Sequence, residues 1–198
     1  MTARDTVLAR IRAALADVPA DHADGQDTVA LFAERVADYR ARVVQTTPGE
    51  ARDTIAGLLT GNDARTLVVP PGFPPELAPD GPWRRLAEPL GLSDLEAADS
   101  VLTTCGAGIA VTGTVVLDAG PGQGRRALTL LPDHHVCVVR AEQIVADVPD
   151  AIALLDPARP LTFVSGPSAT SDIELDRVEG VHGPRILDVV IVREEPRA

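Results

Sequence analysis

Lysine is absent from this chain, so its side-chain positive charge comes from arginine. The absence excludes Schiff-base chemistry and any phosphate-binding loop that depends on a lysine. Basic residues number 18 against 29 acidic ones, which gives a net charge of −11. Nucleic-acid binding through a basic face is therefore not expected, because phosphate contacts need clustered basic side chains. The pair Arg125-Arg126 is too small a cluster to change this expectation.

Aromatic residues and cysteines are also scarce. Aromatic residues make up 3% of the chain and hydrophobic residues 45%, so we expect a sizeable core built mainly from Val, Leu, Ile and Ala. Cys105 and Cys137 lie in apolar stretches and are expected to be buried, reduced thiols. Two cysteines cannot supply the four thiolates of a usual iron–sulfur cluster. We expect this chain to bind no cofactor and no metal.

Long hydrophobic runs are missing as well. No apolar run approaches the ~18 residues that a membrane-spanning helix needs. The first residues are polar and charged and do not resemble a signal peptide. We therefore expect a cytoplasmic protein without a membrane span.

The hydrophobic periodicity predicts an α/β fold. We expect an N-terminal helical arm over residues 1–42 and an α/β domain over residues 43–198, together forming one compact unit of 198 residues. Helical patterns occur at residues 2–16, 27–40, 48–61, 93–98 and 141–155. Strand patterns occur at residues 43–44, 66–69, 101–104, 108–111, 114–118, 127–131, 135–139, 161–165 and 186–192.

The stretch from Phe163 to Glu174 has an unusual composition. An apolar strand pattern ends at a Gly-Pro turn, and the hydroxyls and carboxylates that follow suit a helix N-terminus. In an extended chain Asp172 and Glu174 share one side, whereas on a helix they diverge by about 200°. The stretch suits either a carboxylate nucleophile or base, or a capped structural turn. His182 is the other nearby group that titrates in the neutral range.

Two further motifs contain polar residues in strand-like surroundings. Thr112-Gly113-Thr114 lies between β-branched runs and predicts a bulge or a close backbone approach. It is either a plain strand kink or a place where amides and hydroxyls face a ligand. His134 and His135 are adjacent, so on a strand they point to opposite faces and cannot chelate one metal together. Asp133 with one of them is a possible acid–base pair, and a hydrogen-bonded histidine in a loop is the alternative.

Four motifs together resemble a known family. They are Thr112-Gly113-Thr114, Leu130–His135, Gly166–Glu174 and Gly180–Pro184, and they occur in this order. They resemble the LUD domain of the lactate utilisation protein C family, and the resemblance is most specific over residues 100–192.

The resemblance implies a fold, a function and partners. The fold would be a Rossmann-like core similar to ribose-phosphate isomerase, glucosamine-phosphate isomerase and CoA-transferases. The function would be participation in the oxidation of L-lactate to pyruvate. The partners would be two other lactate-utilisation proteins, at least one of which carries iron–sulfur clusters. A small carboxylate is a possible ligand of this chain.

This chain departs from the family at one position. The family commonly has Ala-Glu-Thr-Gly-Thr where this chain has Val111 in place of the glutamate. Valine cannot act as acid, base or ligand. If the glutamate is catalytic in relatives, this chain has lost it or uses Asp172 or Glu174 instead.

These observations leave three functional hypotheses. The chain is a subunit of a lactate-oxidising system, a stand-alone isomerase or acyl-transfer enzyme of the related fold, or a non-catalytic scaffold or regulator that docks a partner through its helical arm. Whether the chain is itself an enzyme stays open. The catalytic candidates are Asp172, Glu174 and His182. The candidate ligand-binding residues are Thr112, Gly113, Thr114, Gly166, Pro167, Ser168, Thr170 and Ser171.

Overall fold

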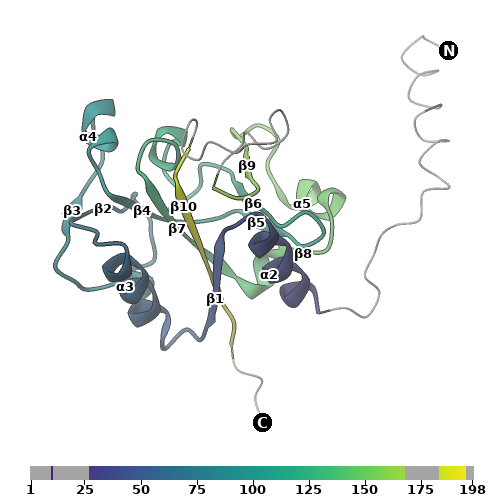
Figure 1. The fold of residues 1–198 in the computed structure, drawn as a ribbon. Coiled ribbons are helices and arrows are strands. Elements are labelled where there is room, and N and C mark those ends of the chain that lie inside the picture. Colours follow the sequence, from purple (N-terminus) through teal and green to yellow (C-terminus); the bar gives the residue numbers. More distant parts are fainter. Residues whose placement is uncertain (1–9, 11–26, 168–182, 195–198) are drawn as a thin grey trace.

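The fold is known from a computed structural model that describes residue 10, residues 27–167 and residues 183–194. It is a mixed α/β fold that contains two sheets (Figure 1). Apart from residue 10, the helix predicted over residues 2–16 lies outside the described residues, as do Ser168, Thr170, Ser171, Asp172, Glu174 and His182.

The larger sheet has six strands, all parallel. Two adjacent interior strands have six consecutive buried residues each, a pattern typical of parallel strands covered on both faces. In spatial order the strands are β1 (Arg42–Thr46), β10 (Ile186–Val192), β7 (His134–Arg140), β4 (Ser100–Thr104), β2 (Thr66–Val68) and β3 (Arg84–Leu86).

The smaller sheet has four strands and mixed directions. Strands β5 and β6 pair antiparallel, β6 and β9 pair antiparallel, and β5 and β8 pair parallel. In spatial order the strands are β8 (Ile144–Val145), β5 (Ala107–Ile109), β6 (Thr114–Leu117) and β9 (Thr162–Val164). The strand that contains Phe163 is therefore an edge strand of the smaller sheet and does not belong to the parallel sheet.

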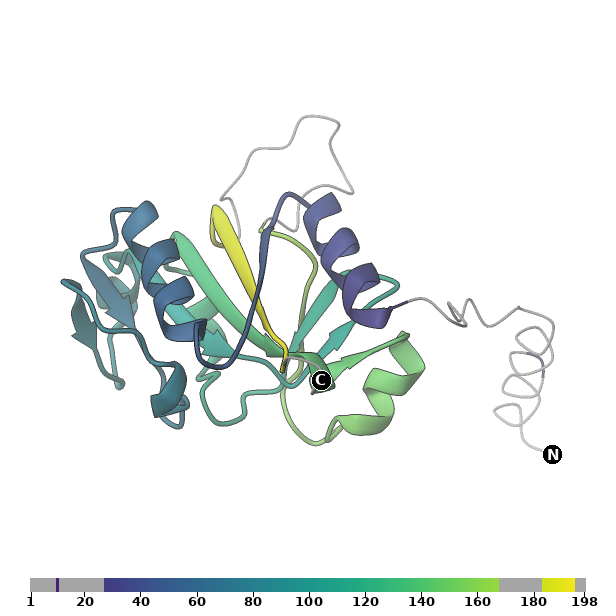
Figure 2. The ribbon, with the colours of Figure 1, turned by 90° about the horizontal axis from the view of Figure 1, so that it is seen from below.

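Helices α2 (Thr28–Asp38) and α3 (Ala51–Gly61) lie on opposite sides of β10 (Figure 2). The Asp27 side chain caps α2 by accepting from the backbone N–H of Val29 and Ala30. The apolar side of α2 packs with Val139 and Ile191 on one face of the parallel sheet. The apolar side of α3 packs against the other face. Each face thus has its own core.

Val29 and Phe32 belong to the core beneath α2, and Phe32 is fully buried. The scaffold hypothesis needs exposed apolar side chains on the helical arm to dock a partner, and these two side chains are buried. Val7 and Ile11, which would contact the partner together with Val29 and Phe32 in that hypothesis, lie outside the described residues.

In two stretches the observed secondary structure differs from the predicted one. Residues 127–131 were expected to form a strand, but the 3-10 helix η2 (Arg126–Thr129) is present instead. The single helix expected over 141–155 is wrong as well. That stretch contains the 3-10 helix η3 (Ala141–Gln143), then β8, then the short helix α5 (Val148–Leu154) with its proline in the first turn.

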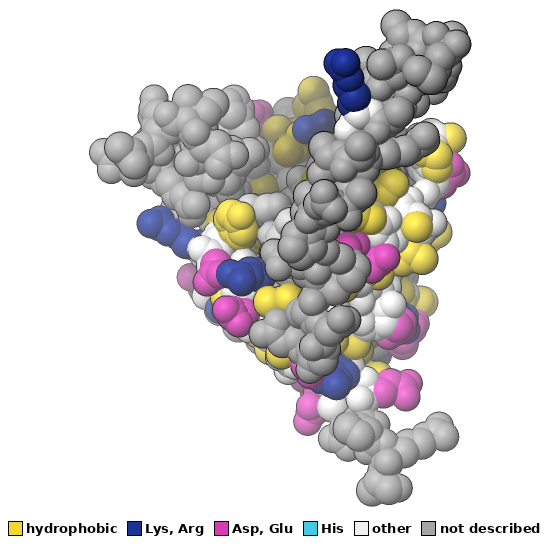
Figure 3. Space-filling view, turned by 90° about the vertical axis from the view of Figure 1, so that its right-hand side faces the viewer, with side chains coloured by type: hydrophobic (Ala, Val, Ile, Leu, Met, Phe, Trp, Pro, Cys, Tyr) yellow, Lys and Arg dark blue, Asp and Glu magenta, His cyan; other side chains and the backbone are white. Residues whose placement is uncertain are grey.

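The remaining helices are α4 (Leu92–Glu96) and the 3-10 helix η1 (Pro75–Leu77). Within the described ranges, no helix is long and apolar enough to cross a membrane. Figure 3 views the side of the molecule on which α2 and α5 lie. Hydrophobic side chains there form several groups with acidic and basic side chains between them.

Candidate functional site

A groove runs between η2 and β9 at the side of the parallel sheet from which β7 and β10 begin. Its volume is about 130 Å³. One wall is formed by Arg126, Thr129 and Leu130, the other by residues 162–167, and Gly183 and Pro184 close one end. A second cavity of about 70 Å³ adjoins it and shares Arg126, Thr129 and Thr162 with it. The two cavities therefore adjoin along η2, and together they are called the trough.

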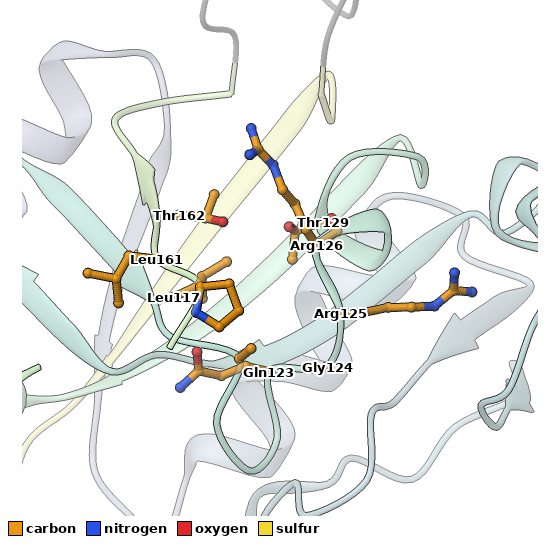
Figure 4. A pocket seen from close by; sticks show the side chains of 10 residues that line it. Leu117, Gln123, Gly124, Arg125, Arg126, Thr129, Leu161 and Thr162 are labelled. Atoms are coloured by element: carbon orange, nitrogen blue, oxygen red, sulfur yellow. Dashed lines mark hydrogen bonds between the residues drawn. The ribbon is translucent and has the colours of Figure 1, made fainter. Parts of the chain in front are cut away.

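Arg126 is the cationic group of this groove. Its side chain is exposed and projects past Thr162, whereas Arg125 points the other way (Figure 4). Arg125 forms an ion pair with Glu88 at 2.6 Å and donates to the carbonyl of Leu90. Among the described residues, no carboxylate lies within ion-pair distance of the Arg126 guanidinium. Within the described ranges, Arg126 thus offers a positive charge at the groove that no carboxylate compensates.

Hydroxyl groups line the groove next to this charge. The Thr129 hydroxyl donates to the backbone carbonyl of Arg126 at 3.1 Å, which fixes the 3-10 turn. Thr162 lies on the opposite wall (Figure 4). The Ser165 hydroxyl is hydrogen-bonded to the Thr114 hydroxyl at 2.7 Å. The groove therefore combines one guanidinium with several neutral hydrogen-bonding groups.

The motif Thr112-Gly113-Thr114 lies behind the groove wall and does not line it. The Thr112 and Thr114 hydroxyls are 2.8 Å apart, so with Ser165 they form a chain of three hydroxyls. Two motifs that are distant in the sequence are thereby brought together. A ligand-binding role for the Thr-Gly-Thr motif stays a prediction.

Gly113 and Gly166 let the backbone pass close to the end of α2. Gly113 has a φ of 56°, and a Cβ there would lie 2.5 Å from the carbonyl carbon of Arg35. Gly166 has a φ of 87°, and a Cβ there would lie 2.7 Å from the Cβ of Tyr39. Only glycine fits both the left-handed conformation and the short distance. The close approach predicted for Gly113 is therefore present, and its partner is the helix backbone.

The apolar surface of the groove comes from Leu130, Phe163, Val164, Pro167 and Pro184. Phe163 is 48% exposed and Leu130 36% exposed, so both leave apolar surface at the groove open to solvent. Pro167 and Gly183 are neighbours in space, because a Cβ on Gly183 would lie 3.5 Å from the Pro167 carbonyl oxygen. An occupant of the groove would cover apolar surface here.

A second polar group of residues crosses the face of the parallel sheet that α3 covers. The Arg42 guanidinium donates two hydrogen bonds to the Asp188 carboxylate, at 2.8 and 2.6 Å. Asp188 also lies 2.9 Å from His134 Nε2, and His134 Nδ1 lies 2.9 Å from the Ser100 hydroxyl. Burial opposes ionisation of Asp188, but the hydrogen bonds from His134 and Arg42 outweigh it and lower the pKa of this carboxyl.

These residues include a Ser, a His and an Asp, but they do not form an accessible nucleophile. Ser100, His134 and Asp188 are at most 3% exposed. The carboxylate is already neutralised by an arginine, and the serine lines neither of the two cavities described above. Asp133, one possible partner of a histidine in the sequence, instead pairs with Arg185 at 3.6 Å. The alternative of a hydrogen-bonded histidine is observed, and we interpret the group of Arg42, Asp188, His134 and Ser100 as structural.

The two histidines do point to opposite faces, as predicted, although they lie in β7 and not in a loop. His135 Nε2 lies 2.8 Å from the Thr103 hydroxyl, and Cys137 is close by on the same face. Cys105 and Cys137 are buried free thiols, as expected. A hydrogen bond between them, helped by His135 and Thr103, lowers the pKa of Cys137, and the same bond with burial raises the pKa of Cys105. The surroundings of the thiols are thus less apolar than the sequence suggested.

A metal site is not evident in the described ranges, where no three or more His, Cys, Asp or Glu side chains are grouped for one ion. The sequence reasoning missed Arg126, Thr129 and Thr162 as site residues. Arg126 was considered only as part of a basic pair, and the strand predicted over 127–131 would have hidden the groove. The one available signal was two adjacent arginines directly after a glycine-rich turn.

Comparisons with known proteins agree on a family. The LUD domain family matches residues 92–192, a region that contains every residue lining the groove. Lactate utilization protein C of Deinococcus radiodurans is 48% identical over 166 residues, which cover 81% of this chain and 77% of that protein. The protein of the same name from an Exiguobacterium species is 29% identical over 148 residues, covering 70% of this chain and 62% of that protein.

A solved structure is similar as well. The crystal structure of a DUF162 family protein from Deinococcus radiodurans superposes with a TM-score of 0.72 at 40% sequence identity. The superposition covers 84% of this chain and 96% of that one. Since the domain match spans more than half of the sequence, this chain belongs to the LUD domain family.

Proposed function

We propose that this chain takes part in lactate utilization, as a cytoplasmic subunit of a system that oxidises L-lactate to pyruvate. The observation that carries the proposal is the 48% identity, over 81% of this chain, to a protein named Lactate utilization protein C. The groove supports it, because a guanidinium beside hydroxyls and apolar surface suits a small carboxylate.

The chemistry suggests a division of labour between subunits. Converting lactate to pyruvate removes two electrons and two protons, and a redox cofactor must accept the electrons. The whole chain has two cysteines, fewer than the four thiolates that iron–sulfur clusters usually need. We therefore propose two lactate-utilisation partner proteins, at least one of which carries the iron–sulfur clusters.

The function is tested by deleting the gene in its native host. The deletion strain should grow poorly on L-lactate and normally on pyruvate, and a plasmid copy should restore growth on lactate. A strain without another lactate dehydrogenase that still grows normally on lactate contradicts the proposal.

The proposed partners are tested separately by affinity purification from lactate-grown cells. Iron–sulfur proteins should co-elute with the tagged chain and be identified by mass spectrometry. Their absence under conditions that preserve lactate oxidation would reject the subunit assignment and leave the pathway assignment intact.

A second candidate is a stand-alone isomerase or acyl-transfer enzyme with a core similar to ribose-phosphate isomerase or the CoA-transferases. The all-parallel sheet and the positive charge at the groove favour it, because a guanidinium also binds phosphate. In that case Asp172 or Glu174 would be the base or nucleophile. The purified chain should then convert a sugar phosphate or a CoA thioester unaided, and Glu174→Gln should abolish turnover. Absence of turnover in the wild type counts against this candidate.

A further inference from the structure

The groove between η2 and β9 differs from the other charged regions of the described chain. Most arginines there have carboxylate partners, for example Arg42 with Asp188 and Arg159 with Asp118. Arg126 has none within the same ranges, and it projects along a trough that offers hydroxyls and apolar surface. A charge placed in this way is available to a ligand.

We propose that Arg126 anchors the carboxylate of a small 2-hydroxy or 2-oxo acid in this groove, with Thr162 and Ser165 beside the hydroxyl or oxo oxygen on C2. The proposal rests on the proposed function and adds to it the location of the site, the residue that binds the charge, and the class of ligand. The planar guanidinium can donate two parallel hydrogen bonds to a carboxylate.

The charge balance favours a monoanion. Of the two arginines along the trough, Arg125 is turned away and held by Glu88, so among the described residues a single cation faces the ligand. A phosphate dianion would be only half neutralised by it, in a protein whose net charge is −11. A carboxylate with one negative charge is matched by one guanidinium.

The hydroxyl chain gives the groove a proton donor. Thr112 can donate to Thr114 and Thr114 to Ser165, which leaves the Ser165 proton free to point to a ligand oxygen. Thr112 and Thr114 are then positioning residues that act through Ser165. This arrangement explains how a motif that does not line the groove contributes to it.

The apolar walls suit the small methyl end of such an acid. Leu130 and Phe163 are partly exposed at the groove, and covering them is favourable. A ligand with one anionic end, one neutral oxygen and one methyl group thus finds a counterpart for each part.

The test measures by NMR how tightly the purified chain binds sodium L-lactate and sodium pyruvate, each added at millimolar concentration. Lactamide is the neutral control, and inorganic phosphate is the dianion control. The wild type should bind lactate or pyruvate more tightly than either control. Arg126→Gln should weaken binding by about tenfold to a hundredfold, since it removes a charge-assisted pair. Arg84→Gln, which removes an arginine outside the groove, should bind like the wild type.

A second variant keeps the proposal testable if Arg126→Gln folds poorly. Thr162→Val preserves side-chain shape and should weaken lactate binding severalfold, with little change for acetate, which has a carboxylate but no oxygen on C2. Equal lactate affinity in the wild type and both variants overturns the proposal, as does tighter binding of phosphate than of lactate and pyruvate.

Failure of this inference is distinguishable from failure of the proposed function. If the wild type binds neither acid while the deletion strain still fails to grow on lactate, the groove assignment is wrong and the pathway stands. If the acids bind through Arg126 while the deletion strain grows normally, the groove assignment stands and the pathway is wrong.

Discussion

Two regions of this molecule contain an arginine beside hydroxyl groups, and they differ in what neutralises the charge. At the chain formed by Arg42, Asp188, His134 and Ser100, the guanidinium meets a fully buried carboxylate in a bidentate pair. At the groove, Arg126 meets no described carboxylate and borders a cavity of about 130 Å³. Arg42 is thus paired within the fold, whereas Arg126 is available to a ligand.

The comparison shows why residue types alone do not identify a site. Ser100, His134 and Asp188 have the composition of a hydrolase triad, but their polar atoms are largely satisfied by one another and enclosed. The groove has no such composition, but it has the space and the uncompensated charge. Solvent access and charge balance therefore distinguish a group of residues with a structural role from one that can bind a ligand.

The largest expected effect separates the two regions by stability. Asp188→Asn should lower the free energy of unfolding by about 3 kcal/mol, because it leaves Arg42 and His134 facing a neutral amide. Arg126→Gln should change it by less than about 0.5 kcal/mol. Urea unfolding followed by fluorescence of Trp83, the single tryptophan, measures both. A large loss in Arg126→Gln would show that Arg126 is also structural.

A pH titration sharpens the same contrast. Despite its burial, the pKa of Asp188 is lowered by His134 and Arg42, so the folded chain holds this carboxylate ionised at a lower pH than the unfolded chain does. The stabilisation is fully present above the unfolded pKa of about 3.9 and is lost as the pH falls through the folded pKa. The midpoint of urea unfolding in the wild type should therefore fall more steeply below about pH 4 than in Asp188→Asn. Equal slopes would assign the acid sensitivity to other carboxyls, such as Asp99.

The central strands and the first helices could be predicted from the sequence. The Val-rich runs of β7 and β10 are continuous because both of their faces are buried, and α2 has apolar residues at helical spacing after an Asp cap. The adjacent histidines were placed on opposite faces from strand geometry alone. Each of these patterns lies within one segment of the sequence, so it can be recognised without knowing which segment packs against it.

The groove could not be predicted, because it joins segments that are distant in the sequence. Its walls come from residues 126–130 and 162–167, and nothing in either segment specifies the other. The run Ala127–Leu131 also misled, since a short apolar run fits a strand and a helical turn equally well. Its Leu128 packs on Val68 and Leu95, and this tertiary contact favours the 3-10 turn. That turn is what places Arg126 at the groove.

The smallest expected effect concerns the hydroxyl chain that supports the groove wall. Thr114→Val keeps the side-chain shape but leaves the Ser165 and Thr112 hydroxyls without their shared partner, so the free energy of unfolding should fall by about 1 kcal/mol. Thr60→Val is the matched control, because the Thr60 hydroxyl is exposed and donates to a backbone carbonyl of its own helix. It should cost less than about 0.5 kcal/mol. If Ser165 acts on the ligand, Thr114→Val should also weaken lactate binding, which the control should leave unchanged. Lost stability with unchanged binding would confine the hydroxyl chain to architecture, as at Ser100 and His134.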